Sequence, residues 1–514
     1  MKILNVVQIH ALDQETIRRE RITSTDLMER AATRCTDWLE NEFLKNFPIK
    51  KQFLFHIYCG TGNNGGDGLA ICRILLDRGY HAMASVIWHS PRVSEDFTIN
   101  YQKLREIYPS SIADIRTEKD LINSEKDEII IDAIFGSGLN KIPSGLAATA
   151  IAYINGLKKT VISIDVPSGL FCDQSTIFLK GSVVKADYTL TFELPKLAFM
   201  FPENSAFVGE WFIIPIDSDS QYLSQVETKN YFTTIDDIFP LIEKRKLFSH
   251  KGNYGHSLLI CGSKGKIGAA VLSSRACLKS GTGLLTVNIP ACGYNILQSS
   301  VPEAMVISSE TEEFLSGLPP LEKYNAIGIG PGIGLEKETQ NLLKLLIQNT
   351  PVPLIIDADA INILAENKTW LSFLPKGCIF TPHIGEFTRL CGPASTDFDR
   401  HQIQREFSFK YQCFIVLKGA NTCISTPEGN YYFNSTGNPG MATGGSGDAL
   451  TGIITSLCAQ RYAPLSACVT GVYLHGLAGD FAATELSEHS VTATDIIDYI
   501  PKAFLYLSKE TFPK

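Results

Sequence analysis

The glycine-rich run NPGMATGGSGD at residues 438–448 holds the side chains best suited to chemistry in this chain. The next ten residues, ALTGIITSLC, have the apolar pattern of a helix. Backbone N–H groups of the glycine run can therefore face an anion at the positive end of that helix. Asp448 stands where a carboxylate could take a proton from a hydroxyl that attacks phosphorus. The run predicts phosphoryl transfer with Asp448 as the base, and the structural alternative is a helix cap.

A second glycine run, CGTGNNGGDG, occupies residues 59–68 and contains the dinucleotide-binding pattern GxGxxG. An NAD-binding site of that type needs an acidic residue about 20 positions further on. Residues 78–94 contain no Asp or Glu, which leaves an NADP variant that uses Arg92. The other interpretation places the glycines at a helix N-terminus that faces a phosphate, with Asp67 on a ribose hydroxyl or on the loop itself.

Two more carboxylates follow apolar runs in the first half of the chain. Asp132 opens the loop DAIFGSGLN and Asp165 opens DVPSG. Asp165 could act as a general acid or base, although either carboxylate could instead cap its loop. Asn64, Asp132 and Ser168 carry hard oxygen ligands that suit a monovalent or other hard cation.

The elements that must position these residues are short runs rich in Val and Ile, at 53–58, 128–132, 161–165, 257–261, 326–330, 354–357 and 413–417. Such runs are typical of strands buried on both faces of a parallel sheet, and helical patterns lie between them. The alternation predicts α/β domains, in which ligands bind beyond the carboxyl ends of the strands. The polar stretch at 217–230 predicts a boundary near residue 225, which gives domains of 1–225 and 226–514.

Composition limits the classes of partner. The net charge of −8 and the pI of about 5.8 argue against a nucleic-acid binder, because such a protein needs a basic surface. The 13 cysteines include no CxxC pair, which indicates reduced thiols. The chain shows neither a signal-peptide pattern nor an apolar run of membrane-spanning length. We therefore expect a cytoplasmic protein that binds neither nucleic acid nor membrane.

Further loops in the second half follow predicted strands. CGSKGKIG at 261–268 is rich in Gly and Lys, but a Walker A sequence occurs nowhere in the chain, which disfavours a P-loop NTPase. GPGIG at 330–334 follows another strand, and TPHIGE at 381–386 places His383 and Glu386 in a loop. A lone histidine is more often structural than functional. KGANT at 418–422 brings Lys418 to a place where nucleotide phosphates could lie.

The first-half motifs, CGTGNNGGDG, DAIFGSGL and DVPSG in this order, resemble the NAD(P)HX epimerase family. That family has a Rossmann-like fold and interconverts the R and S forms of hydrated nicotinamide cofactors, in which C6 carries a hydroxyl next to the ring nitrogen. The resemblance implies catalysis by Asp165 and potassium at Asn64, Asp132 and Ser168. Ala32 departs from the glycine expected on the first helix. The implied substrate contacts are Asn63, Asn64, Gly65, Gly66, Asp67, Gly136, Ser137, Gly138, Leu139, Asn140, Lys141, Ile142 and Asp165.

The second-half motifs, including HKGNYGH at 250–256 and HGLAGD at 475–480, resemble the ADP-dependent NAD(P)HX dehydratases. These have the three-layer α/β/α fold of the ribokinase-like superfamily. Ser446 replaces an expected Thr but keeps the hydroxyl. The resemblance implies substrate contacts at Ala269, Gly332, His383 and Asp448. The implied nucleotide contacts are Lys418, Gly419, Ala420, Asn421, Thr422, Gly444, Gly445, Ser446 and Gly447.

The order of the two resemblances, epimerase then dehydratase, is similar to that of the fused bifunctional repair enzymes. It implies that ADP, with Mg²⁺, phosphorylates the C6 hydroxyl of the S hydrate of NADH or NADPH. AMP and phosphate are released and the nicotinamide ring is restored. The epimerase half, with K⁺, supplies the S form from the R form, and we expect a homo-oligomer.

Two alternatives use the same residues differently. A ribokinase-like kinase for a vitamin or sugar would share Asp448 and the glycine run but would release a phosphorylated product. The N-terminal half of such a kinase would be a non-catalytic, regulatory dinucleotide-binding domain. The second alternative, from another class, makes the N-terminal half a non-catalytic binding or scaffold module. Asn64, Asp132, Asp165 and Ser168 argue against a scaffold role.

Overall fold

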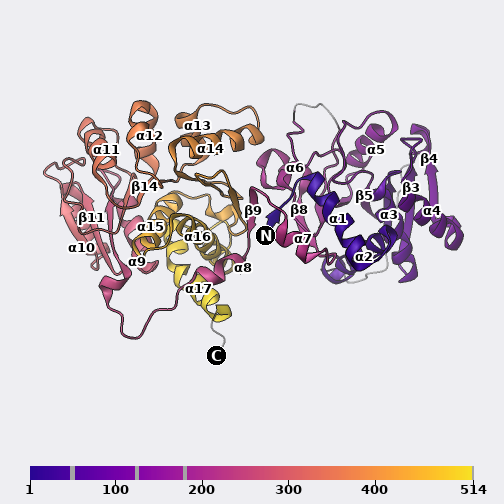
Figure 1. Cartoon of the computed structure of the whole chain (residues 1–514), viewed down its shortest axis with the longest axis horizontal. Coiled ribbons are helices and arrows are strands. Elements are labelled where there is room, and N and C mark those ends of the chain that lie inside the picture. Colours follow the sequence, from indigo (N-terminus) through magenta and orange to yellow (C-terminus); the bar gives the residue numbers. More distant parts are fainter. Residues whose placement is uncertain (47–52, 122–126, 178–181, 512–514) are drawn as a thin grey trace. The chain divides into compact units, whose positions relative to one another are not determined.

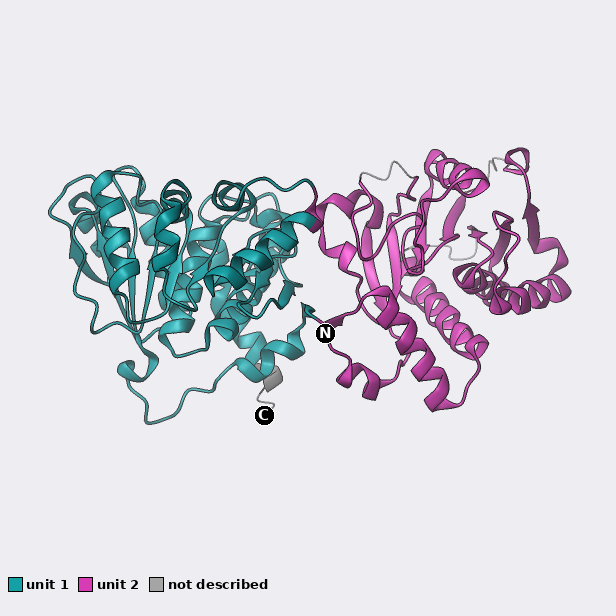
Figure 2. Ribbon diagram, turned by 45° about the horizontal axis from the view of Figure 1, so that its top comes forward, with its two compact units in different colours: residues 1, 229–395, 399–514 teal, residues 2–228, 396–398 magenta. Residues whose placement is uncertain are grey.

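The computed structural model describes residues 1–46, 53–121, 127–177 and 182–511. The chain forms two compact units (Figure 2). The N-terminal unit comprises Lys2–Thr228 and Thr396–Phe398, and the C-terminal unit comprises Met1, Lys229–Ser395 and Asp399–Lys514. The polar stretch at 217–230 contains the helix α7 (Ser220–Gln225), although its sequence shows no strong periodicity.

The N-terminal unit is built on a parallel sheet whose strand order is β4–β3–β2–β5–β6–β7–β8. The order reverses at β2 and β5, so the loops after these strands open side by side at the carboxyl edge. The strands are β2 (Leu54–Cys59), β3 (His81–Ile87), β4 (Ile112–Ile115), β5 (Glu128–Ala133), β6 (Thr160–Ile164), β7 (Tyr188–Phe192) and β8 (Glu210–Ile214).

Alternate residues of these strands enter separate cores, as the two-residue period of a strand requires. Phe55 and Ile57 pack with α2, α3 and α4, whereas Tyr58 and Ile130 pack with α5. Helices therefore cover both faces, and the predicted three-layer Rossmann-like fold is confirmed. The helices of the unit are α1 (Val6–Glu20), α2 (Ser24–Trp38), α3 (Asn63–Asp77), α4 (Glu95–Ile107), α5 (Gly145–Gly156), α6 (Ser205–Val208) and α7.

The C-terminal unit contains the parallel strand order β16–β15–β14–β13–β10–β11–β12, extended beyond β16 by the antiparallel strands β17 and β18 and then by β9. Its order reverses between β10 and β13. The strands are β9 (Asn230–Thr233), β10 (His256–Ile260), β11 (Leu284–Ile289), β12 (Met305–Ser308), β13 (Ala326–Ile329), β14 (Leu354–Ile356), β15 (Ile379–Phe380), β16 (Phe414–Leu417), β17 (Cys423–Ser425) and β18 (Tyr431–Asn434).

Helices enclose this sheet on both faces, as Figure 1 shows around β14. Ile355 packs with α15, α16 and α17, and its neighbour Ile356 packs with α11, α12 and α13. This arrangement is the predicted ribokinase-like α/β/α sandwich. The helices are α8 (Ile235–Ile238), α9 (Ile267–Lys279), α10 (Tyr294–Ser300), α11 (Lys337–Asn349), α12 (Ala358–Glu366), α13 (Ile384–Cys391), α14 (Asp397–Tyr411), α15 (Ser446–Ala459), α16 (Pro464–Leu486) and α17 (Ala493–Thr511).

Three segments that the sequence assigns to loops belong to helices. Asn63 to Asp67 form the start of α3, Ser446 to Asp448 form the first turn of α15, and Glu386 lies in the first turn of α13. Helix starts are hard to place from sequence because Gly and Asn disfavour helix interiors but are tolerated in the first turn. Thr23 and Asp26 form a capping box at the start of α2. All 13 cysteines are free thiols, and no helix in the described part of the chain could cross a membrane.

Candidate active sites in the two units

The C-terminal unit encloses a cavity of about 860 Å³ at the carboxyl ends of its strands. The glycine run reaches this cavity through Gly445, the residue before α15, whose φ of +89° favours glycine. No side chain caps α15, and only the Ser446 N–H is engaged, with the Thr443 carbonyl, so the N–H groups of Gly447 and Asp448 are available to an anion. The predicted residues that line the cavity are His383, Lys418, Gly419, Ala420, Thr422, Gly445, Ser446, Gly447 and Asp448.

Side chains of helix α16 contact the glycine run. Asp480 accepts hydrogen bonds from the Gly437 N–H and the Asn438 side chain, each at 2.9 Å. The ring of His475 lies 3.3 Å from Ser446 Oγ. Burial, with the charge of Lys418, lowers the pKa of His475 to about 4, so the ring is neutral. The HGLAGD motif therefore positions the glycine run, which explains its presence far along the chain.

Asp448, in the first turn of α15, lies near the charged side chains of Asp357 and Lys418. Burial, and then the charge of Asp357, raise the pKa of Asp448 to about 7, and Lys418 partly offsets this rise. Lys418 Nζ lies 2.9 Å from Asp357 Oδ1, and Thr451 donates to the other Asp357 oxygen at 2.7 Å. A carboxylate with a pKa near neutrality can exchange a proton at physiological pH, as a general base must.

Four of the other predicted C-terminal residues do not line the cavity. Asn421 and Gly444 adjoin lining residues without lining the cavity themselves, and Ala269 and Gly332 lie beside each other outside it. His383 has a structural role as well as its cavity position, because its ring accepts hydrogen bonds from the Gly385 and Glu386 N–H groups and caps α13.

Asp357 was not among the predicted site residues, although it directly follows an apolar run. Replacing Asp357 with Asn removes a negative charge that raises the pKa of Asp448. We expect the rising limb of the pH profile for any reaction that uses Asp448 as a base to move to lower pH. Initial rates measured across pH test this, with the exposed Asp498→Asn variant as the control. An unchanged midpoint would contradict the assigned electrostatic coupling.

The N-terminal unit has a smaller cavity of about 330 Å³ at the carboxyl edge of its sheet. Asp165 lines it with a φ of +63°, a left-handed conformation that is uncommon outside glycine and frequent at functional sites. Its carboxylate accepts a hydrogen bond from the Ser137 N–H at 2.8 Å and pairs with Lys196 Nζ at 3.1 Å. Burial alone would raise the pKa of Asp165, but Lys196 and the Ser137 bond outweigh it and lower the pKa.

Of the other predicted N-terminal substrate contacts, the structure brings Asn63, Asp67 and Ser137 to this cavity. Gly65 has a packing role, because a Cβ at this position would lie 1.8 Å from the Gly60 carbonyl oxygen. The remaining predicted contacts do not line the cavity: Asn64, Gly66, Gly136, Gly138, Leu139, Asn140, Lys141 and Ile142. The other lining residues were not predicted from the sequence, and they include the charged residues Asp13, Glu193 and Lys196.

The three predicted cation ligands, Asn64, Asp132 and Ser168, are all buried. Asp132 is fully buried and accepts hydrogen bonds from Ser168 Oγ at 2.6 Å and Ser163 Oγ at 2.8 Å. The side-chain amide of Asn64 donates to the Ile164 carbonyl, which leaves its oxygen buried without a hydrogen-bond partner. A buried amide oxygen without a partner, a carboxylate and a hydroxyl are the kinds of oxygen that a hard cation takes as ligands. Clusters of three His, Cys, Asp or Glu side chains are absent from the described residues.

These two units, each with a cavity at the carboxyl ends of parallel strands, define a two-domain α/β enzyme with Rossmann-like and ribokinase-like parts. Residues 257–502 match the family model described as NAD(P)H-hydrate dehydratase, and residues 24–198 match that of the YjeF-related protein N-terminus. The chain belongs to the family of bifunctional NAD(P)H-hydrate repair enzymes.

Relatives with that name align over the whole chain. The Moorella thermoacetica enzyme is 33% identical over 99% of this chain and 98% of its own length. The Thermofilum pendens enzyme is 32% identical over 99% and 97%. The structure of a Bacillus subtilis ADP/ATP-dependent NAD(P)H-hydrate dehydratase, co-crystallised with ATP/Mg²⁺, is 31% identical, covers 54% of this chain and 98% of its own, and has a TM-score of 0.48.

Proposed function

We propose that this chain repairs hydrated NADH and NADPH by two successive reactions. The N-terminal unit interconverts the R and S hydrates, and the C-terminal unit dehydrates the S hydrate with ADP. The observation that carries the dehydratase assignment is Asp448, whose pKa is about 7, beside Lys418 and the uncapped N-terminus of α15. We assign the reactions to residues 1–225 and 226–514.

The dehydratase reaction needs a base, an anion site and a nucleotide site. Asp448 takes the proton of the C6 hydroxyl while the hydroxyl oxygen attacks the terminal phosphorus of ADP. AMP is the leaving group. Phosphate then departs with the C6–O electron pair, and loss of a C5 proton restores the ring. The N–H groups of residues 444–447 stabilise the transferring phosphoryl group, and residues 418–422 hold the nucleotide.

The same site residues fit the proposed cofactors. Mg²⁺ would neutralise nucleotide phosphate charge near Asp448 and Asp357, since oxygen ligands and phosphates are its usual partners. The orphaned oxygen of Asn64, with Asp132 and Ser168, would hold K⁺ in the N-terminal unit. The free thiols suit a reducing compartment such as the cytoplasm.

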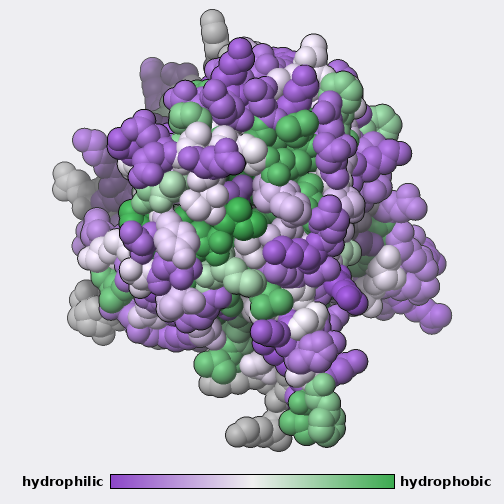
Figure 3. Space-filling model, turned by 90° about the vertical axis from the view of Figure 1, so that its left-hand side faces the viewer, coloured by the Kyte–Doolittle hydropathy of each residue, from purple (hydrophilic) through white to green (hydrophobic). Residues whose placement is uncertain are grey.

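We also propose self-association through the β12 edge of the C-terminal unit. Strand β12 ends the sheet, and Tyr294 and Ile296 on α10 and Met305 on β12 are all more than two-fifths exposed. Figure 3, which views the molecule from the side of Figure 1 where α10 and β11 lie, shows hydrophobic side chains gathered near the centre of the face. Exposed apolar patches on sheet edges favour association with a second copy.

The direct test supplies a mixture of R and S hydrates of NADH, first with ADP and then with ATP. Recovery of the absorbance of reduced nicotinamide measures dehydration, and chromatography of the remaining hydrate measures epimerisation. We expect both hydrates to be consumed. A vitamin or sugar kinase, the alternative function, would restore no NADH with either nucleotide, and full-length relatives named as repair enzymes do not favour it.

A further inference from the structure

Asp13 shares the N-terminal cavity with Asp165, although the two residues come from opposite ends of the unit's sequence. Asp13 lies on α1, and Asp165 directly follows β6. Asp165 is held by Lys196 and by the Ser137 N–H. Among the described residues, the Asp13 carboxyl has no hydrogen-bond partner, so it is available to a ligand in the cavity. Asp13 and Asp165 therefore line one cavity from different elements.

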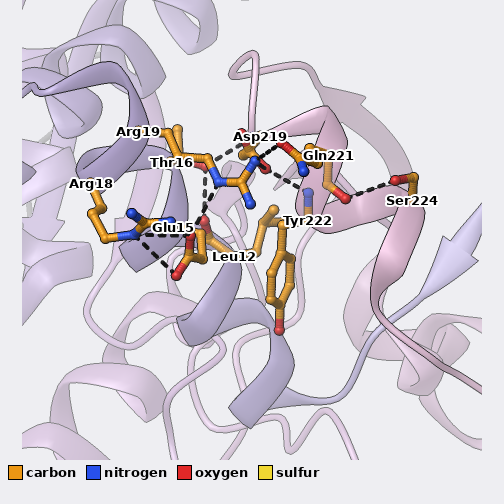
Figure 4. A network of polar contacts seen from close by, with 9 residues as sticks. All are labelled: Leu12, Glu15, Thr16, Arg18, Arg19, Asp219, Gln221, Tyr222 and Ser224. Atoms are coloured by element: carbon orange, nitrogen blue, oxygen red, sulfur yellow. Dashed lines mark hydrogen bonds and ion pairs between the residues drawn. The ribbon is translucent and has the colours of Figure 1, made fainter.

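The position of Asp13 is fixed by polar contacts elsewhere on α1 (Figure 4). Asp219 donates its backbone N–H to Thr16 Oγ1 at 2.9 Å, and its carboxylate lies 3.5 Å from Arg19. Thr16 in turn donates to the Leu12 carbonyl at 2.8 Å. These contacts join α1 to α7 and leave Asp13 directed to the cavity, so its placement is a built feature of the unit.

The charges around the two carboxyls drive them to opposite protonation states. Burial, and then the charge of Asp165, raise the pKa of Asp13 to about 7, with a smaller rise from Glu193 and a partial offset from Lys196. Lys196 instead lowers the pKa of Asp165. Asp67 also lines this cavity, and burial, followed by the charges of Asp165 and Asp13, raises its pKa well above the usual range. Paired carboxyls whose pKa values are pushed apart are the usual arrangement for one acid and one base.

We propose that Asp13 and Asp165 are the acid and base pair of epimerisation, an inference that rests on the proposed function. Asp13 gives its proton to the C6 hydroxyl of the R hydrate. The C6–O bond breaks, its electron pair leaves with water, and the lone pair of the ring nitrogen forms a C=N bond. Water then adds at the other face of C6, the C=N electrons return to nitrogen, and the released proton passes to Asp165.

Exchange with solvent then restores protonated Asp13 and ionised Asp165 for the next turnover. The reverse reaction uses the same groups in exchanged roles, because microscopic reversibility makes the acid of one direction the base of the other. Lys196 is a positioning residue in this scheme: it keeps Asp165 ionised through their 3.1 Å ion pair.

The test is Asp13→Asn in the full chain, assayed for conversion of purified R hydrate to S hydrate without ADP. We expect a rate loss of about 10²- to 10⁴-fold, the usual contribution of a general acid. ADP-dependent dehydration of purified S hydrate should be unchanged, because the C-terminal unit carries that reaction. Glu15→Gln is the matched control, because Glu15 lies on the same helix but pairs with Arg18 and Arg19 at the surface (Figure 4).

The pH dependence gives a second readout that loss of packing alone would not produce. Since Asp13 is the acid, conversion of the R hydrate by the unmodified chain should fall as pH rises through about 7. The residual activity of Asp13→Asn should lack that fall. Retained conversion within about threefold of the unmodified chain, or the same fall in the variant, would overturn the inference. Absence of conversion in the unmodified chain would instead refute the epimerase function itself.

Discussion

Replacing Asp448 with Asn should reduce ADP-dependent dehydration of the S hydrate by about 10²- to 10⁴-fold, because Asn cannot accept the hydroxyl proton. The change is nearly isosteric, so nucleotide binding at Lys418 should persist. Initial rates of NADH recovery at saturating ADP measure the loss. Conversion of R to S hydrate should stay at its normal rate, since Asp165 lies in the other unit.

The pH profile of the unmodified chain follows from the same carboxylate. With its pKa raised to about 7 by burial and by Asp357, Asp448 is protonated and inactive as a base below that pH. Dehydration should therefore rise as pH increases through about 7 and then level off. A rate that is flat between mildly acidic and neutral pH, or full activity in the Asp448→Asn variant, would remove Asp448 from the role of base.

Replacing Asp165 with Asn should lower the rate of conversion of R to S hydrate by about 10²- to 10⁴-fold. The variant loses the charge that pairs with Lys196, and its left-handed backbone is retained because Asn tolerates that conformation. Chromatography of purified R hydrate over time measures the loss. Given a mixture of hydrates and ADP, the variant should convert the S form and leave the R form.

The control for this variant is Asp37→Asn in the same unit, where Asp37 forms a surface ion pair with Arg78. It should convert the R hydrate at the normal rate, since exposed ion pairs contribute little to stability. Unchanged conversion in the Asp165→Asn variant would favour the alternative in which the N-terminal unit is a non-catalytic module.

The residues that sequence identified in the active sites are those in continuous motifs. Asp448, Asp165 and Lys418 each stand directly after or within a glycine-rich run or apolar strand, and the structure places each of them on a cavity. The rule that ligands bind beyond the carboxyl ends of parallel strands explains why these residues reach the cavities, because a local pattern locates the strand end. The same rule would have included Asp357, which follows β14.

The residues that sequence missed reach the cavities from elements without a motif. Asp13 lies on a helix rich in polar residues, where an isolated Asp has no distinguishing neighbour, and Lys196 follows β7, whose apolar pattern is weak. Their importance depends on burial and on the charges that surround them, and both arise from contacts between segments distant in the sequence.

By itself, the sequence determined the two α/β folds and the strand-end motifs, because local periodicity indicates the buried strands and glycine marks the loops that follow them. Only the tertiary structure decided the protonation of the site carboxyls. The same side chain, Asp, has a pKa raised to about 7 at positions 13 and 448 and lowered at 165. The difference is physical. Burial and neighbouring carboxylates outweigh Lys196 at Asp13 and Lys418 at Asp448, whereas the ion pair with Lys196 and the Ser137 hydrogen bond outweigh burial at Asp165.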